Sequence, residues 1–280
     1  MSNADLSLAS LENTDLRSAN LSGANLVHVN LNGADLRGAS LQNANLSEAT
    51  LVGANLEGIS LHGCTVERTV FTQANMQKAN LDGLHLSGLS FRKANLSGAT
   101  LIKANLCHAD MSGADLSYAD FSEADLQNAN LTKVQATKVV LTSAYLKFSR
   151  IENANLSGAE LYGASLESAN LNHCRLNKAD LSNANLCQAS LCYADLREAQ
   201  MIYANFSNAV LTNADMLDGA ADNVLCEDIS IFQKVNWYSS HNVAAEDESN
   251  LDSWNEEYLR LDEWDKLSDS FNPNDPWSYV

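Results

Sequence analysis

Six cysteines and six histidines are the residues of this chain that could most readily ligate a metal or act as nucleophile and base. The cysteines lack the spacing of a disulfide framework, which indicates reduced thiols in a cytosol-like compartment. Serine and aspartate recur throughout the chain, so a Ser–His–Asp grouping among them is expected by chance. No glycine-rich phosphate loop or nucleotide signature is present. Whether such residues could act together depends on the fold that positions them.

The sequence repeats every five residues. From Leu6 to Met216 every fifth residue is apolar, and 32 of these 43 positions are leucine. The residue two places earlier is alanine in 32 of the 43 repeats, and the residue just before the apolar centre is usually asparagine or aspartate. A period of five matches neither an α-helix nor a simple strand. It predicts a coil in which each pentapeptide forms one side, with two side chains inside and three outside.

Four such sides close a square coil of 20 residues, and successive coils pair as a parallel ladder about 4.8 Å apart. We therefore predict an all-β, quadrilateral parallel β-helix of about eleven coils over residues 1–222. Leucine fills the interior centre, and alanine fills the tighter inner position, where a larger side chain would cost ~1–3 kcal/mol. Phe71 and Phe91 are centres separated by one full coil and are predicted to stack. The Asn, Asp, Ser and Thr side chains are predicted to hold the bends.

The A(D/N)LxG pattern, seen in ANLSGANL, GADLRGASL and SGADLSYADF, resembles the pentapeptide-repeat family over about residues 3–220. The resemblance implies a right-handed quadrilateral β-helix and, as in most members of that family, a non-enzymatic protein. It covers cyanobacterial-type members, many without an assigned biochemistry. It also covers the quinolone-resistance type, which imitates duplex DNA and binds DNA gyrase or topoisomerase IV.

An uninterrupted rod offers no pocket to exclude water and order reacting groups, so we expect no catalytic residues and no cofactor. Metal ligands on such a rod would lie most simply one full coil apart, and no two Cys or His residues have that separation. We therefore expect no metal site. Cys64 and Cys174 occupy inward positions and are interpreted as small core residues. Cys107, Cys187 and Cys192 follow apolar centres and are predicted to face outward.

The formal net charge of −18 argues against direct binding of nucleic acid or an anionic membrane through a basic surface. No apolar stretch is long enough to cross a bilayer, and the first residues show no secretory signal. We predict a cytoplasmic protein. Most of the acidity lies beyond the repeats, because residues 217–280 carry 15 acidic and 3 basic residues.

Residues 223–280 are predicted to form an acidic, tryptophan-rich tail with a helix near 251–267. We interpret this helix as a cap on the end of the β-helix, where apolar side chains and unpaired backbone would otherwise be exposed. The alternative is a dimerisation or partner helix, so the chain is a monomer or a homodimer joined end to end or through the tail. The candidate cap or dimer residues are Leu251, Trp254, Tyr258, Leu261 and Trp264.

Residues 131–150, LTKVQATKVVLTSAYLKFSR, form one complete predicted coil with an altered interior. Three of its four apolar centres are leucine, whereas the fourth is the smaller Ala136. Val134 and Val139 replace alanine at two inner positions, which fills part of that space.

The exterior of the same coil has four positive charges and no acid. Exposed aromatic side chains beside cations are typical of interface anchors. The other interpretation is a degenerate coil that its neighbours tolerate. The candidate partner-binding residues are Lys133, Lys138, Val140, Tyr145, Lys147, Phe148 and Arg150.

These observations favour a non-enzymatic scaffold that binds another, unidentified protein. The first alternative is a DNA mimic that inhibits or protects a type II topoisomerase such as DNA gyrase. An unbroken rod and the overall negative charge favour it, whereas the mild acidity of the coils and the basic coil weigh against it. A secreted bacterial effector is the third alternative.

Overall fold

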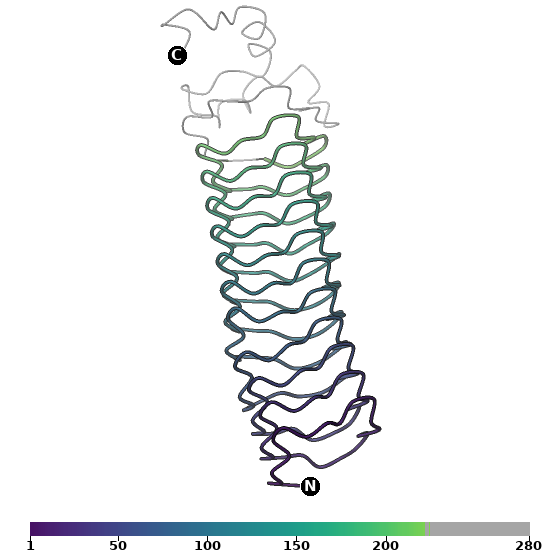
Figure 1. The fold of residues 1–280 in the computed structure, drawn as a ribbon. Helices are drawn as coiled ribbons and strands as arrows, with labels where there is room; N and C mark the ends of the chain where they lie inside the picture. Colours follow the sequence, from purple (N-terminus) through teal and green to yellow (C-terminus); the bar gives the residue numbers. More distant parts are fainter. Residues whose placement is uncertain (222–223, 225–280) are drawn as a thin grey trace, which may run out of the picture. The chain divides into compact units, whose positions relative to one another are not determined.

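A computed structural model describes residues 1–221 and 224. These residues form a stack of similar coils that follow one another along the chain (Figure 1). Residues 20 places apart pair in parallel bridges along the whole stack, from Asp5 with Asn25 to Gln200 with Ala220. One coil therefore consists of four pentapeptides, in agreement with the repeat predicted from the sequence.

The bridges are single residues, one in each pentapeptide. Among the described residues there is no longer run of strand and no helix. The fold is therefore a repeat β-solenoid whose coils are joined by isolated bridges. Within the described part of the chain no helix is long and apolar enough to cross a membrane.

The backbone of each pentapeptide leaves one N–H group without a main-chain acceptor. In residues 26–30, the N–H groups of Leu26, His28 and Asn30 donate to carbonyl oxygens of adjacent coils at 2.7–3.0 Å, and a fourth N–H group closes the turn. Val27 supplies the remaining N–H group, which donates to the side-chain oxygen of Asn25 at 3.3 Å. An asparagine or aspartate just before the centre thus caps the N–H group just after the centre. We call this contact the Asx cap.

The third residue of every turn has a left-handed backbone. His28 has φ = 56° and Gly33 has φ = 65°, and the same conformation recurs every five residues. A positive φ at this position is the signature of a type II turn. Glycine adopts it without steric cost, whereas an L side chain is strained there. The repeated glycines at this position therefore have a conformational reason that the sequence analysis missed.

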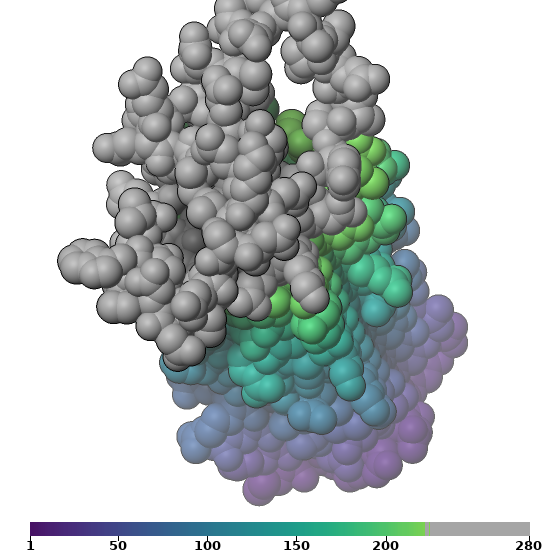
Figure 2. Space-filling model, turned by 90° about the horizontal axis from the view of Figure 1, so that it is seen from above, coloured from purple at the N-terminus to yellow at the C-terminus, as the bar shows by residue number. Residues whose placement is uncertain are grey.

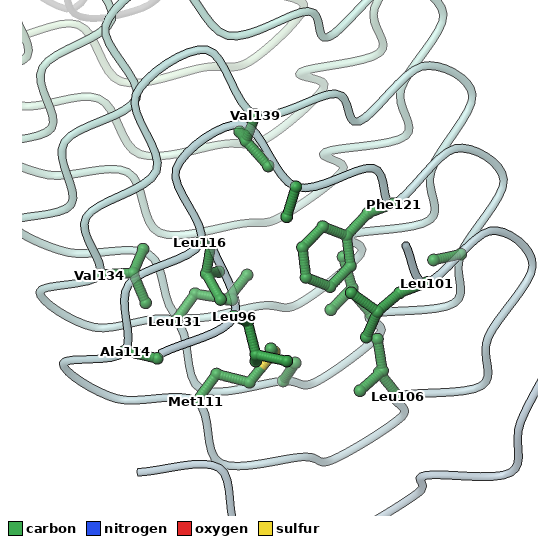
Figure 3. Close-up of a cluster of buried hydrophobic side chains, with 14 of the residues drawn as sticks. Leu96, Leu101, Leu106, Met111, Ala114, Leu116, Phe121, Leu131, Val134 and Val139 are labelled. Carbon is green, nitrogen blue, oxygen red and sulfur yellow. The ribbon is translucent and has the colours of Figure 1, made fainter. Parts of the chain in front are cut away.

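The core runs continuously through the stack, since the leucine centres and inner alanines from residue 21 onward are almost completely buried. Figure 3 shows Leu101, Phe121 and Val139 directed into this shared interior. The rings of Phe71 and Phe91 stack with centroids 5.2 Å apart and planes 5° apart, which confirms that prediction.

The stacking of one coil on the next arranges the outer side chains in columns. Seen from above, successive coils overlie one another and their side chains project from the outer edges (Figure 2). Each coil contains four bridge residues with two turn residues between successive bridges; we call the stretch around a bridge residue a side and the two turn residues a corner. This register decides which residues of different coils share a surface.

The chain divides into two compact units, Met1–Ser240 and His241–Val280. The described residues belong to the first unit. The domain boundary predicted between residues 222 and 223 remains a prediction. The predicted helix near 251–267 and its residues Leu251, Trp254, Tyr258, Leu261 and Trp264 lie outside the described residues.

Candidate interaction surface

The coil of residues 131–150 lacks all four of its Asx caps. Its bridge positions hold Gln135, Val140, Tyr145 and Arg150 in place of asparagine or aspartate. Within the described residues, no acceptor bonds the backbone N–H groups that these side chains would cap, those of Thr137, Thr142, Lys147 and Glu152. Elsewhere in the described coils, N–H groups at this position that have no acceptor occur singly or in adjacent pairs. The coil with the altered exterior therefore also lacks backbone hydrogen bonds that a regular coil makes.

The preceding coil, residues 111–130, is the opposite case, because its bridge positions hold three aspartates and Asn130, and the bridge position just before it holds a fourth aspartate. Asp110, Asp115, Asp120 and Asp125 each accept the backbone N–H group two residues later, at 2.9–3.1 Å. Partial burial raises the pKa of Asp110, but hydrogen bonds from Ser112 and Arg92 outweigh it and lower the pKa overall. A fully capped, acidic coil thus lies directly against an uncapped, basic one.

The interior of the uncapped coil contains a small apolar cavity. Its volume is about 20 Å³, and its lining includes Val134, Ala136 and Val139 together with leucine centres of neighbouring coils. Ala136 stands where a leucine would fill the axis, and the two valines fill only part of the missing volume. A cavity of this size could hold one water molecule, but its lining offers no polar partner, so we expect it to be dry.

Tyr145 and Phe148 lie outward and are 52% and 51% exposed, as the sequence predicts. Lys147 lies between them in sequence, with its Nζ atom 5.0 Å from the centroid of the Phe148 ring. Nζ also donates to Oε1 of Glu167 at 2.6 Å, so this lysine is paired with an acid of the next coil. Phe148 has φ = 59°, a conformation that is strained for a bulky residue.

Tyr162 extends the aromatic cluster and was missed by the sequence analysis. It is 49% exposed, and its carbonyl oxygen accepts the backbone N–H of Ser143 at 2.9 Å, which places it on the coil above that corner. Tyr145 lies on the side that follows this corner, and Phe148 lies at the corner after that side. The register of the coils could have revealed this neighbour. We call the surface formed by Tyr145, Lys147, Phe148, Tyr162 and Glu167 the Tyr145 surface.

The four cations of the coil do not form one patch. Lys133 and Lys138 lie at the two corners that border the Gln135 side, and no acid within the described residues pairs with either of them. Arg150 lies on the side after Phe148, with its Nε atom 3.8 Å from Oε1 of Glu152. Val140 is half-buried at a bridge position between Asp120 and Glu160. The structure thus places the candidate partner-binding residues on different surfaces.

Three thiols in the described coils are held in the protonated form. Cys64 and Cys174 are buried and donate to carbonyl oxygens of Leu41 and Ile151, each at 2.9 Å. Burial raises the pKa of the Cys64 thiol to about 11 and that of Cys174 to about 12. Burial likewise raises the pKa of Cys107 to about 11. These three thiols are therefore protonated at neutral pH, which disfavours both nucleophilic attack and metal ligation.

No group of three or more His, Cys, Asp or Glu side chains among the described residues is arranged to hold a metal ion. His173 stacks on Tyr193 with ring centroids 5.0 Å apart, and His28 Nδ1 lies 3.4 Å from Glu48 Oε2. These contacts join neighbouring coils along the outside of the rod, so the two histidines are best explained as surface packing residues.

The four-sided coils, the inward leucines and the Asx caps define a repeat solenoid built from pentapeptides. A family model of pentapeptide repeats matches the chain in eight copies, over residues 1–33, 30–68, 51–88, 59–101, 94–133, 140–177 and 179–216. The chain therefore belongs to the pentapeptide repeat family, which confirms the resemblance. The matched ranges stop at residue 133 and resume at residue 140, within the uncapped coil.

Solved structures of other pentapeptide repeat proteins resemble the chain. HetL from the cyanobacterium Nostoc sp. strain PCC 7120, a protein involved in the regulation of heterocyst differentiation, is 32% identical; the match covers 82% of this chain and 92% of HetL, with a TM-score of 0.28. QnrB1, a plasmid-mediated fluoroquinolone resistance protein, is 21% identical over 68% of this chain and 89% of its own, with a TM-score of 0.36. No curated protein sequence matches the chain.

Proposed function

We propose that the protein is a non-enzymatic scaffold that binds another protein through the Tyr145 surface. One observation carries the proposal: three aromatic side chains, Tyr145, Phe148 and Tyr162, are each about half exposed and gather at one side of the rod. Large aromatic side chains that are buried on association supply most of the binding energy of many interfaces. A single exposed aromatic side chain would need no explanation, whereas a cluster on adjacent coils does.

The polar groups of the surface fit the same role. Lys147 and Glu167 pair at 2.6 Å beside the aromatic rings, so a partner does not have to neutralise an isolated charge there. The backbone N–H of Lys147 is free to donate to an acceptor on the partner, because Tyr145 cannot cap it. An interface with an aromatic centre and a polar rim is the usual arrangement in specific complexes.

Affinity capture from the native host tests this proposal. Tyr145→Ala combined with Phe148→Ala is expected to weaken the capture of the main partner about tenfold or more, because it removes two central anchors. The matched control is Tyr118→Ala combined with Tyr193→Ala, which removes two similarly exposed tyrosines elsewhere on the rod and is expected to leave capture unchanged.

Two results would contradict the proposal. One is equal capture by the double variant and the wild type. The other is unfolding of the double variant, which would make these side chains structural. Tyr145→Asn is a second test, because it removes one ring while placing the common bridge residue at that position; we expect it to fold and to bind more weakly.

The second candidate is a DNA mimic that acts on a type II topoisomerase. The ring of four aspartates from Asp110 to Asp125 favours it, since these carboxylates lie in a regular acidic coil. The lysines at 133 and 138 weigh against it, because they interrupt the acidic surface one coil further on. A gyrase supercoiling assay decides between the two functions: no effect at micromolar protein would exclude the mimic.

The finer form of the fold belongs to the same proposal. We propose a right-handed, quadrilateral coil of about eleven turns, a helical cap near residues 251–267, a cytoplasmic location, and a monomer or homodimer. Bridges that join equivalent positions of successive coils support the coil geometry. Export as a bacterial effector is the least supported alternative, since only the acidic composition of the tail favours it.

A further inference from the structure

The lysines of the described coils divide into two groups according to the residue that stands one coil further on. Lys103, Lys147 and Lys178 have a glutamate at that position and pair with it at 2.6–3.4 Å. The other lysines have glycine or asparagine there and make no ion pair with any described residue. These unpaired lysines are Lys78, Lys93, Lys133 and Lys138.

All four unpaired lysines lie on one face of the rod. We define the lysine face as the side that contains Asp115 and Gln135, together with the two corners that border it, over the coils between residues 72 and 178. Two of the four lie at the corner before this side and two at the corner after it. The cations of the lysine face are Lys78, Arg92, Lys93, Lys133, Lys138, Arg175 and Lys178, and its acids are Asp115 and Glu152. Its charge is therefore opposite to that of the whole chain.

Glycine stands beside three of the unpaired lysines. A Cβ atom on Gly158, one coil after Lys138, would lie 3.3 Å from Cγ of that lysine. Lys78 and Lys93 lie in the same way next to a glycine of the following coil, each with Cγ at 3.6 Å. A glutamate at these positions would be close enough to pair with the lysine, as the glutamate after Lys147 does. Glycine leaves these ammonium groups to an acid from outside the rod.

Backbone donors without an acceptor lie next to three lysines of the face. Arg92, Thr137 and Asn177 have N–H groups that no described residue accepts, and each of them is directly followed by a lysine. In a regular turn the oxygen of the Asx cap accepts this N–H group. At these three turns the cap position holds serine, glutamine or arginine. A carboxylate from outside the coil would meet a backbone donor and an ammonium group at the same corner.

We propose that the lysine face binds an acidic, extended segment of another protein. Its cations attract carboxylates, and the backbone N–H groups without an acceptor add donors that suit the same group. The face rises about 24 Å from Lys78 to Lys178, at about 4.8 Å per coil. An extended segment of about seven residues, at about 3.3 Å per residue, spans that length.

Acids on both borders of the lysine face favour a peptide over a nucleic acid. Asp120, Glu160 and Asp180 occupy bridge positions on the side that follows the face. Asp110 lies on the side that precedes it. A duplex carries phosphates on both strands and would meet these acids together with the cations, whereas a single extended chain fits between them. The formal net charge of −18 also opposes the approach of a long polyanion.

Fluorescence anisotropy of a labelled polyglutamate peptide, titrated with the full chain at low salt, tests this inference. We expect binding that weakens as salt rises, because salt screens ionic contacts. Lys133→Gln with Lys138→Gln is expected to weaken binding about fivefold, since two exposed ion pairs are lost. The matched control is Lys103→Gln with Lys147→Gln, which removes the same charge from lysines that are already paired, and it is expected to change the affinity less than about twofold. No saturable binding, or equal weakening by the two variants, would overturn the inference.

Gly158→Glu tests the contribution of the glycine corners from the opposite direction. A glutamate one coil after Lys138 is expected to pair with that lysine and to weaken peptide binding about twofold or more. Gly88→Glu is the matched control, because it adds the same charge at another corner, where φ is 69° compared with 67° at Gly158. Peptide binding that is equal in the two variants would contradict a specific contact at Lys138.

Two further probes test the chemical class of the partner. A single-stranded oligonucleotide of the same charge and vesicles that contain phosphatidylserine are both expected to bind more weakly than the peptide at the same salt concentration. Tighter binding of either would overturn the inference and assign the face to a nucleic acid or a membrane. The lysine face and the Tyr145 surface share no residue, so failure here leaves the Tyr145 surface untouched.

Discussion

At the scale of single residues, the asparagine or aspartate of the repeat has a specific task. Four of the five backbone N–H groups of a regular pentapeptide find main-chain acceptors, and the side chain before the centre accepts the fifth. A serine or threonine side chain at this position often does not reach the N–H group two residues later. Ser40 and Thr65 are examples, because the N–H groups that they would cap have no acceptor. The preference for Asn and Asp is therefore explained by hydrogen bonding of the turn.

Asp180→Ala measures the value of one Asx cap. Asp180 accepts the backbone N–H of Ser182 at 2.9 Å, and its loss is expected to lower the free energy of unfolding by about 1 kcal/mol. Glu160→Ala is the matched control. Glu160 is the bridge partner of Asp180, and no described residue accepts the N–H of Tyr162 that it would cap. Urea denaturation that gives equal losses for both variants would contradict the assignment.

Arginine two residues after a bridge aspartate adds a second local contact. Arg17 donates to both oxygens of Asp15, at 2.9 and 2.7 Å, and this contact lowers the pKa of Asp15 to about 2. Arg197 repeats the arrangement with Asp195, whose pKa is also lowered. Since the folded-state pKa is below the ordinary value of 3.8, the contribution to stability is present above that value and is lost as the pH falls toward 2.

At the scale of elements, the coil is the cooperative unit, because each coil contacts only its neighbours. The coil of residues 131–150 combines four uncapped turns with an interior cavity of about 20 Å³. Both features lower the stability of this coil relative to the coils on either side. A weak coil in the middle of a solenoid is costly unless its exposed groups have another use, which supports a binding role for this coil.

A mutant cycle tests whether Val134, Ala136 and Val139 share one interior volume. Ala136→Leu alone is expected to cost about 1–3 kcal/mol through overpacking. Val134→Ala with Val139→Ala is expected to cost ~2 kcal/mol or more by enlarging the cavity. The triple variant restores the common residues and is expected to be more stable than the sum of these losses by at least about 1 kcal/mol. Additive losses in chemical denaturation would show that the three residues do not compensate one another.

At the scale of the whole molecule, charge is separated between the corners that hold Lys133 and Lys138, the coil that holds Asp115, Asp120 and Asp125, and the acidic residues 217–280. The formal charge of −18 hides this separation, and the sequence alone groups the four cations of residues 131–150 together. The structure places Lys133 and Lys138 at the corners that border the Gln135 side, and Lys147 on the Tyr145 surface. The rod therefore offers two distinct surfaces, one aromatic and one cationic.

Much of the rod could be predicted from the five-residue period. The period identifies the inward residues, the four-sided coil and pairs such as Phe71 and Phe91, because a solenoid repeats its geometry without insertions. The shared corner of Lys78, Lys138 and Lys178 could also be predicted, since their positions differ by whole numbers of coils. The uncapped N–H groups could not be predicted from the sequence, because only the hydrogen-bond pattern of the turn shows which backbone donor depends on a side chain.

The central claim is that a partner protein binds the Tyr145 surface, and amide hydrogen exchange of the complex tests it most directly. On addition of the captured partner, the account predicts slower exchange in peptides covering residues 142–152 and 162–167. It predicts no change at the equivalent corners two coils further on, residues 182–192. Protection elsewhere on the rod with unchanged exchange at 142–152 would contradict the account.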